Sequence, residues 1–129
     1  MNIRSGIDIT SVERIQKDIE NPQFLARILT PIEQEYVAQK RAQKGSTNES
    51  VASTIAGIFA AKEAVSKALK TGLLRGIGFA DISIDHENGA PIVVLSEKAQ
   101  KLLSPSHKTS VSISHDAGLA IALCTIIEF

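Results

Sequence analysis

The sequence predicts an α+β fold in which an antiparallel sheet packs on one long central helix. Three observations favour it. Residues 3–10 alternate as in a strand and pass directly into helical spacing, residues 51–71 form a long alanine-rich helical stretch, and the last third of the chain alternates again. A strand followed by helices and then mostly by strands is typical of α+β architecture.

Length and composition limit the possible classes of protein. A chain of 129 residues with 43% hydrophobic and 22% charged residues predicts a single globular domain, residues 1–129. Basic and acidic residues number 14 each, so we expect no nucleic-acid partner. The apolar run at 119–124 is too short to span a bilayer, and the single cysteine, Cys124, forms no internal disulfide. We therefore expect no membrane association, a cytoplasmic protein, and a buried Cys124.

The first forty-four residues predict one strand and two helices. Residues 3–10 alternate between isoleucines and polar residues, which turns Asp8 away from the isoleucines. Thr10 and Glu13 form a capping-box pattern, so we expect a helix that ends at Asn21 and Pro22.

An apolar turn is expected at 24–29. A second capping box, Thr30 with Glu33, has a proline at the first helical position and predicts a helix toward Lys44. Residues 45–50 carry no apolar side chain, and we expect a loop there.

The stretch 51–71 predicts one long helix stopped by Gly72. It carries a bulky apolar stripe and a wide face of small residues, so we expect it to be buried on most sides. Burying a charged side chain costs free energy unless an opposite charge or a hydrogen bond compensates it, so Lys62, Glu63 and Lys67 each need a partner.

The last third of the chain predicts a hairpin, a short helix and two more strands. Asn88-Gly89 is a hairpin signal, Ser96 is a helix cap, and Ala117-Gly118 is a turn. The expected elements are strands at 81–85 and 92–95, a helix at 96–103, and strands at 111–116 and 119–127, the last one central.

Asp8 and Glu63 are the carboxylates that stand out. Asp8 at a strand-to-helix junction is either a capping residue or a ligand. Glu63 either pairs with Lys67 four residues on, or joins Asp8 in holding a hard cation. Magnesium uses one or two carboxylates and takes its remaining ligands from water and phosphate, so the sequence permits a magnesium–phosphate site.

Other familiar sites are absent from the sequence. Ser114 lies outside any G-x-S-x-G motif, which excludes a serine hydrolase of that type, and neither a P-loop nor G-x-G-x-x-G occurs. His115 is either a proton carrier or anion contact, or a polar turn residue whose hydrogen bonds are made by its neighbours.

Four segments resemble one family in order along the chain. They are Gly6-Ile-Asp8-Ile-Thr10, Phe59-Ala-Ala-Lys62-Glu63-Ala64-Val-Ser-Lys67-Ala68, Asn88-Gly89-Ala90-Pro91 and Ser112-Ile-Ser114-His115-Asp116. Together they look like the holo-[acyl-carrier-protein] synthases of the 4′-phosphopantetheinyl transferase superfamily. The resemblance implies that superfamily's fold.

The resemblance also implies an activity. The family transfers 4′-phosphopantetheine from coenzyme A to a serine of apo acyl carrier protein, in fatty acid biosynthesis, and leaves adenosine 3′,5′-bisphosphate. By motif position, Asp8 and Glu63 would hold Mg²⁺ on the coenzyme A diphosphate, and Lys67 would neutralise phosphate oxygens. The resemblance leaves open whether Glu63 or a metal-bound water takes the proton of the serine hydroxyl.

Further residues are implied by the same likeness. The implied coenzyme A contacts, besides Lys67, are Lys62 as a supporting residue, Gly89, Pro91 and His115. The implied carrier-binding residues are Arg14, Phe24 and Arg27. The family also implies a homotrimer whose active site is completed across the subunit interface.

Two positions depart from the family pattern. Ile58 stands where members often have arginine, and Lys70-Thr71-Gly72 stands for Gly-Thr-Gly. A basic contact to coenzyme A is therefore missing or moved, and Lys70 is one candidate to replace it. The alternative function is a non-catalytic α+β ligand-binding module in which Asp8, Glu63 and Lys67 form a structural ion network.

Overall fold

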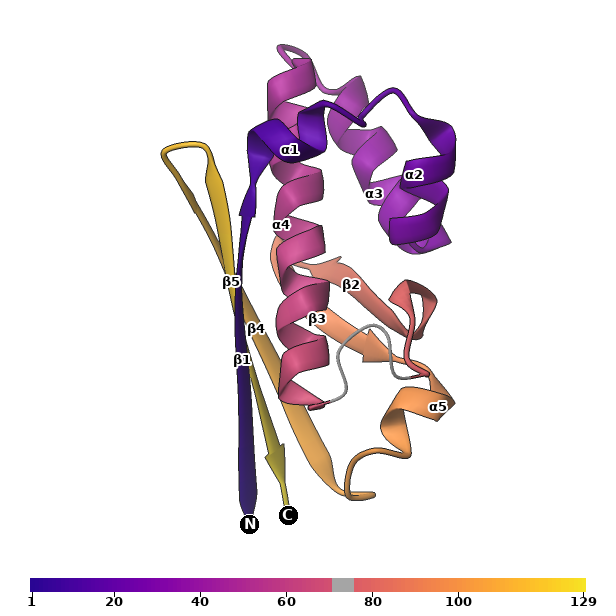
Figure 1. The fold of residues 1–129 in the computed structure, drawn as a ribbon, viewed down its shortest axis with the longest axis vertical. Coiled ribbons are helices and arrows are strands. Elements are labelled where there is room, and N and C mark those ends of the chain that lie inside the picture. The colour runs from indigo at the N-terminus through magenta and orange to yellow at the C-terminus, as the bar shows by residue number, and fades with distance from the viewer. Residues whose placement is uncertain (71–75) are drawn as a thin grey trace.

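The computed structural model describes residues 1–70 and 76–129 and has the expected α+β architecture (Figure 1). A short 3₁₀ turn, Phe79–Asp81, precedes the second strand. In chain order the other elements are β1 (Asn2–Ser11), α1 (Val12–Gln16), α2 (Pro22–Ile28), α3 (Pro31–Ala42), α4 (Asn48–Ala68), β2 (Ile82–Glu87), β3 (Ala90–Leu95), α5 (Glu97–Gln100), β4 (His107–Asp116) and β5 (Leu119–Glu128).

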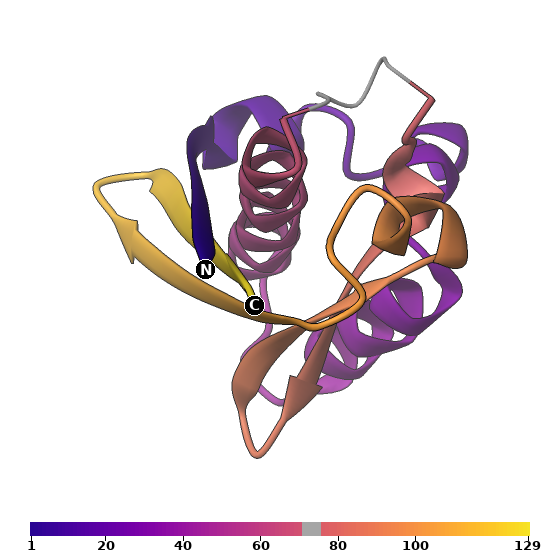
Figure 2. The same ribbon diagram turned by 90° about the horizontal axis from the view of Figure 1, so that it is seen from below.

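The strands form two antiparallel sheets. One has the order β1-β5-β4, which confirms the central place of the last strand, and the other is the β2–β3 hairpin. Seen almost end-on in Figure 2, α4 has β1 beside it on one side, while the hairpin lies on another. Asn88 and Gly89 have φ angles of 51° and 79°, as the predicted hairpin turn requires.

The sheet approaches α4 closely because glycines lie at two of its contacts with the helix. A Cβ added to Gly6 would collide with the carbonyl oxygen of Ala64 and lie 2.7 Å from the backbone nitrogen of Ala68. On the other flank, a Cβ on Gly57 would lie 3.0 Å from Nε2 of His115. Glycine at these two positions lets β1 and β4 pack on the helix backbone.

This packing fixes which face of β1 is inside. Since side chains alternate, Asp8 shares the inner face with Gly6, as predicted, and the isoleucines point outward. Large apolar side chains therefore remain exposed on β1 and on its neighbour β5. We call them the outer apolar face: Ile3, Ile7, Ile9, Leu119 and Leu123, exposed by 60%, 56%, 59%, 38% and 47%.

Two predictions near the N-terminus are wrong. The cap of α1 is Ser11, whose Oγ accepts a hydrogen bond from the Arg14 backbone, while the Thr10 hydroxyl donates to Asp8 Oδ2 at 3.0 Å. The expected turn at 24–29 lies mostly in helix α2. Its cap is Asn21, whose Oδ1 accepts a hydrogen bond from the backbone of Gln23.

Several helix boundaries also differ. The helix capped by Thr30 and Glu33 is confirmed, although it ends at Ala42. The expected loop at 45–50 is partly helical, because Thr47 caps α4 and the helix starts at Asn48. α5 is capped by Ser96 as predicted but ends at Gln100. The predicted stop at Gly72 lies outside the described residues.

Cys124 is buried, as expected, and burial raises the pKa of its thiol to about 11. Over the described ranges 1–70 and 76–129, no helix has both the length and the apolar character needed to cross a bilayer.

The contact at Gly6 predicts a specific loss of stability. Gly6→Ala forces the backbones of β1 and α4 apart, and we expect a loss of about 1–3 kcal/mol in the free energy of unfolding. Chemical denaturation of the variant measures it, with the exposed neighbour Ser5→Ala as control. A Gly6→Ala protein as stable as the control would contradict this packing.

Candidate active site

Asp8, Glu63 and Lys67 meet where β1 crosses α4. The Lys67 ammonium lies 3.2 Å from Asp8 Oδ1 and donates to the Ile7 carbonyl oxygen at 2.8 Å. The Lys67 side chain is 52% exposed and that of Asp8 is 16% exposed. The cluster therefore joins a largely buried carboxylate to a lysine that solvent reaches.

Glu63 has no ion-pair partner within 4.0 Å among the described residues, so the pair with Lys67, one of the two alternatives, is not formed. Its carboxyl is half-buried, and burial raises its pKa. The negative charge of Asp8 raises the pKa of Glu63 further, while Lys67 and Arg14 oppose the shift. Two carboxylates that repel each other at a helix face favour a cation between them.

The donor set fits magnesium. Asp8 and Glu63 offer hard carboxylate oxygens, and no group of three or more His, Cys, Asp or Glu side chains suited to a metal ion occurs among the described residues. A magnesium ion here would need ligands from water or a substrate. The Lys67 ammonium, already at Asp8, is the cation that such an ion would displace.

Lys62 lies in a different environment from Lys67. Its side chain is fully buried, and its ammonium donates to Glu33 Oε1 at 2.6 Å and to the Ile28 carbonyl oxygen at 2.9 Å. Burial lowers the pKa of Lys62, and the charge of Glu33 opposes that shift. Glu33 also accepts hydrogen bonds from the backbones of Thr30 and Ile84.

The Lys62–Glu33 pair thus joins α3, α4 and β2. In this arrangement Lys62 touches no surface where coenzyme A would bind, so its implied part is that of a supporting residue. The sequence analysis identified Lys62 as needing a partner but did not find Glu33, because the two are 29 positions apart.

A second group of site residues converges on the other side of α4. Gly89 and Pro91 of the hairpin and His115 of β4 line one cavity of about 230 Å³. Nε2 of His115 lies 2.9 Å from the Ser53 carbonyl oxygen, which makes that nitrogen the protonated one. The cavity has further lining residues: Tyr36, Lys40, Thr54, Gly57, Ile58, His86 and Ile113.

Sequence analysis missed Tyr36, Lys40 and His86. The rings of Tyr36 and His86 stack with centroids 3.7 Å apart and planes 5° apart. No local pattern indicates this stack, because α3 and β2 are distant in the chain.

Helix α4 separates these two groups. Thr54 of the cavity lies nine positions before Glu63, which places them about 180° apart around the helix. The sheet covers α4 on one side between them, and α3 with β2 packs on the other. Within one chain, the acidic cluster and the cavity therefore face different directions.

The residues implied in carrier binding lie on α1 and α2. Arg14 and Arg27 are exposed, as expected, and Phe24 is half-buried. The guanidinium of Arg14 lies 5.6 Å from the ring centroid of Phe59, and that of Arg27 lies 5.7 Å from that of Phe24. The positive charge of Arg14 lowers the pKa of Glu63, so Arg14 lies near the acidic cluster.

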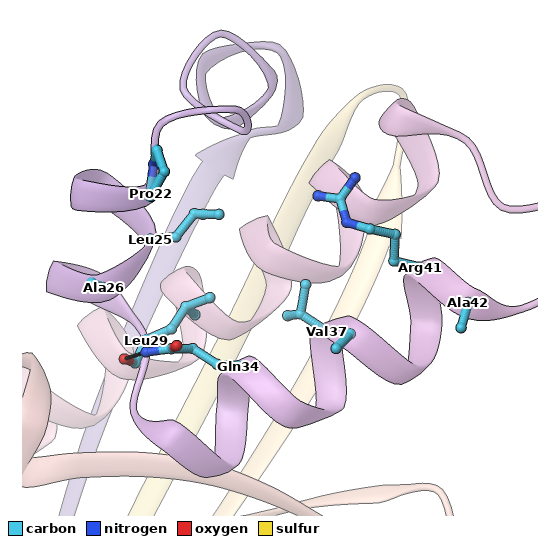
Figure 3. A pocket seen from close by; sticks show the side chains of 9 residues that line it. Pro22, Leu25, Ala26, Leu29, Gln34, Val37, Arg41 and Ala42 are labelled. Atoms are coloured by element: carbon cyan, nitrogen blue, oxygen red, sulfur yellow. Dashed lines mark hydrogen bonds between the residues drawn. The ribbon is translucent and has the colours of Figure 1, made fainter.

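An apolar groove of about 450 Å³ runs between α2 and α3 (Figure 3). Leu25, Leu29 and Val37 line it, and Arg41 is its one charged lining residue. It holds no carboxylate or imidazole, so it carries none of the chemistry considered above.

A family model described as the 4′-phosphopantetheinyl transferase superfamily matches residues 4–124. The chain belongs to this superfamily. The match spans both the acidic cluster and the cavity.

Curated and solved members of the superfamily are similar over almost the whole chain. The holo-[acyl-carrier-protein] synthase of Nitratiruptor is 44% identical over 126 residues, which cover 95% of this chain and 97% of that protein. The Helicobacter pylori synthase, solved with coenzyme A, is 39% identical with a TM-score of 0.74 and coverages of 93% and 96%. The Bacillus anthracis synthase, solved with coenzyme A (3′,5′-ADP), is 34% identical with a TM-score of 0.77 and coverages of 98% and 96%.

The environment of Glu63 predicts the stability of Glu63→Gln. Because the folded-state pKa is raised, ionised Glu63 opposes folding at neutral pH, and this effect disappears as pH falls below its unfolded value of about 4.3. Glu63→Gln should therefore melt at the same temperature as the parent or higher at pH 7. Melting curves from pH 4 to 8 test this, and a lower Tm at pH 7 would indicate a structural ion pair.

The buried pair predicts the opposite behaviour for Glu33. Glu33→Gln leaves the Lys62 ammonium buried without its counter-charge, at a cost of about 3–5 kcal/mol. Adding Lys62→Met should recover part of that loss. Denaturation of the two single variants and the double variant gives the coupling, and purely additive losses would contradict the pairing.

Proposed function

We propose that this chain transfers 4′-phosphopantetheine from coenzyme A to a serine hydroxyl of apo acyl carrier protein. The products are the holo carrier and adenosine 3′,5′-bisphosphate. The observation that carries the proposal is the meeting of Asp8, Glu63 and Lys67 at one partly exposed site, in the motif positions of a superfamily to which the chain belongs. The related synthases solved with coenzyme A support the donor.

In the reaction, a bond forms between the serine oxygen and the phosphorus next to pantetheine, and the bond from that phosphorus to the bridging oxygen breaks. Asp8 and Glu63 would hold Mg²⁺, which supplies positive charge to the diphosphate when bound. Lys67, which lies at Asp8, would neutralise charge that develops on phosphate oxygens. The serine proton would go either to the Glu63 carboxylate or, with Mg²⁺ bound, to a water of the site.

The proposed enzyme works as a homotrimer. Exposed apolar patches of this kind mark surfaces that associate, and the outer apolar face runs along β1 and β5. Since α4 turns the acidic cluster and the cavity in different directions, a second copy can present its cavity to the first copy's Asp8 and Glu63. A donor molecule would then bind between two subunits.

The transfer itself is the first test. Incubation with coenzyme A, Mg²⁺ and apo carrier should add one phosphopantetheine group to the carrier, seen by mass spectrometry. Glu63→Gln should lower the rate by at least about 100-fold, because it removes one charge from the metal site. Chelation of the metal should have the same effect.

Arg41→Gln, which alters only the groove of Figure 3, is the matched control and should transfer normally. A parent chain that binds coenzyme A but never modifies the carrier would support the ligand-binding module instead.

The exposed arginines Arg14 and Arg27 predict how the carrier binds. If Arg14 and Arg27 meet acidic residues of the carrier, Arg14→Ala and Arg27→Ala should raise the carrier KM several-fold at low salt and weaken its salt dependence. The affinity for coenzyme A should change less, and Lys101→Ala, at the exposed C-cap of α5, is the control. Exposed arginines without a partner would leave the carrier KM unchanged at every ionic strength.

A further inference from the structure

We infer that Thr10 is a positioning residue for the proposed metal site. Its hydroxyl fixes one oxygen of the Asp8 carboxylate and so keeps the other oxygen directed at the cation. The inference rests on the proposed function and deepens it, because Thr10 acts through Asp8 and touches neither substrate nor metal itself. From the sequence, Thr10 was expected only to cap a helix, and the structure gives that cap to Ser11.

The backbone of β1 brings the Thr10 hydroxyl to the carboxylate. Side chains two positions apart on a strand point to the same face and lie about 7 Å apart along it, so Thr10 shares the inner face with Asp8. The Thr10 hydroxyl donates to Asp8 Oδ2 at 3.0 Å. Because only 2% of Thr10 is exposed, solvent hardly competes for this proton.

The two oxygens of the Asp8 carboxylate have different partners. Oδ2 accepts the hydrogen bond from buried Thr10, whereas Oδ1 lies 3.2 Å from the ammonium of Lys67, whose side chain is 52% exposed. Lys67 belongs to α4, the helix that also carries Glu63 and runs beside β1 (Figure 1). Oδ1 is therefore the oxygen at which a partner from solution can be exchanged.

The contact with Thr10 remains when the contact with Lys67 is exchanged. In the proposed mechanism Mg²⁺ takes the place of the Lys67 ammonium at Asp8. The hydrogen bond from Thr10 lies within β1 and requires no movement of α4. Without it the carboxylate could turn, because the terminal torsion of an aspartate side chain has a broad energy minimum.

A fixed carboxylate matters here because the site has few protein ligands. Only Asp8 and Glu63 are proposed to hold Mg²⁺, an ion that demands nearly ideal octahedral geometry. Loss of a hydrogen bond that orients a metal ligand typically lowers metal affinity by about 10- to 100-fold. We therefore expect Thr10 to contribute to the affinity of the site for the metal ion.

A simpler explanation is that the Thr10 hydroxyl only satisfies its own hydrogen bond in a packed strand. Removing it would then change the stability of the fold and leave the affinity for metal as it was. The two explanations are separated by measuring metal binding and thermal melting on the same variants.

Titration of the full chain with Mn²⁺, in saturating coenzyme A and followed by electron paramagnetic resonance, tests the inference without relying on turnover. Thr10→Val keeps the shape of the side chain but removes the donor, and should raise the Kd for Mn²⁺ at least about tenfold. Thr10→Ala also lacks the hydroxyl and should show the same loss. Thr10→Ser retains it and should bind Mn²⁺ as the parent does.

Thr109→Val is the matched control. It removes the same hydroxyl from β4, a strand that β5 separates from β1, and should leave the Kd for Mn²⁺ unchanged.

If Thr10→Val and Thr10→Ala bind Mn²⁺ as tightly as the parent, whatever their melting temperatures, the inference is wrong and the proposed function stands. A loss of affinity in Thr10→Ser equal to that in Thr10→Val would also contradict it, because the hydroxyl would then not be the cause. A parent chain that binds coenzyme A but takes up no Mn²⁺ would overturn the proposed metal site together with this inference. Tight Mn²⁺ binding that depends on Thr10, with no modification of the carrier, would overturn the proposed transfer alone.

Discussion

The close approach of α4 to the three-stranded sheet is the constraint on which the rest of the structure depends. Gly6 and Gly57 leave room for β1 and β4 to lie against the helix backbone on its two flanks. Because strand side chains alternate, this contact places Asp8 inside, beside Glu63, and leaves the isoleucines of β1 outside. One packing contact thus sets both the acidic cluster and the apolar face that we propose joins three copies.

Two lysines on α4, Lys62 and Lys67, differ in burial and therefore in the part that each can play. Lys62 points into the core, where its pair with Glu33 is fully enclosed and breaking it is costly. Lys67 lies at β1, where its contact with Asp8 is partly exposed, and in the proposed mechanism a metal ion or a phosphate replaces that contact. The first lysine holds α3, α4 and β2 together, and the second is the one that we propose acts on a ligand.

The sequence predicted the features that depend on local patterns. The long helix, the turn at Asn88-Gly89 and the central last strand follow from alternation, propensity and turn chemistry. Asn21 followed by Pro22 is a helix-start signal, so α2 was predictable from the sequence. The sequence analysis instead interpreted the apolar residues that follow as a turn. The partner of Lys62 and the stack of Tyr36 on His86 were not predictable, because tertiary packing brings those residues together.

The central claim is that each active site takes its acidic cluster from one chain and its cavity from another. Coexpression of Glu63→Gln with His115→Ala tests it directly, since each variant alone damages one half. The account predicts that mixed oligomers recover transfer activity well above that of either parent variant, because some interfaces pair two intact halves. A site built within a single chain would leave every copy defective, and the mixture would show no recovery.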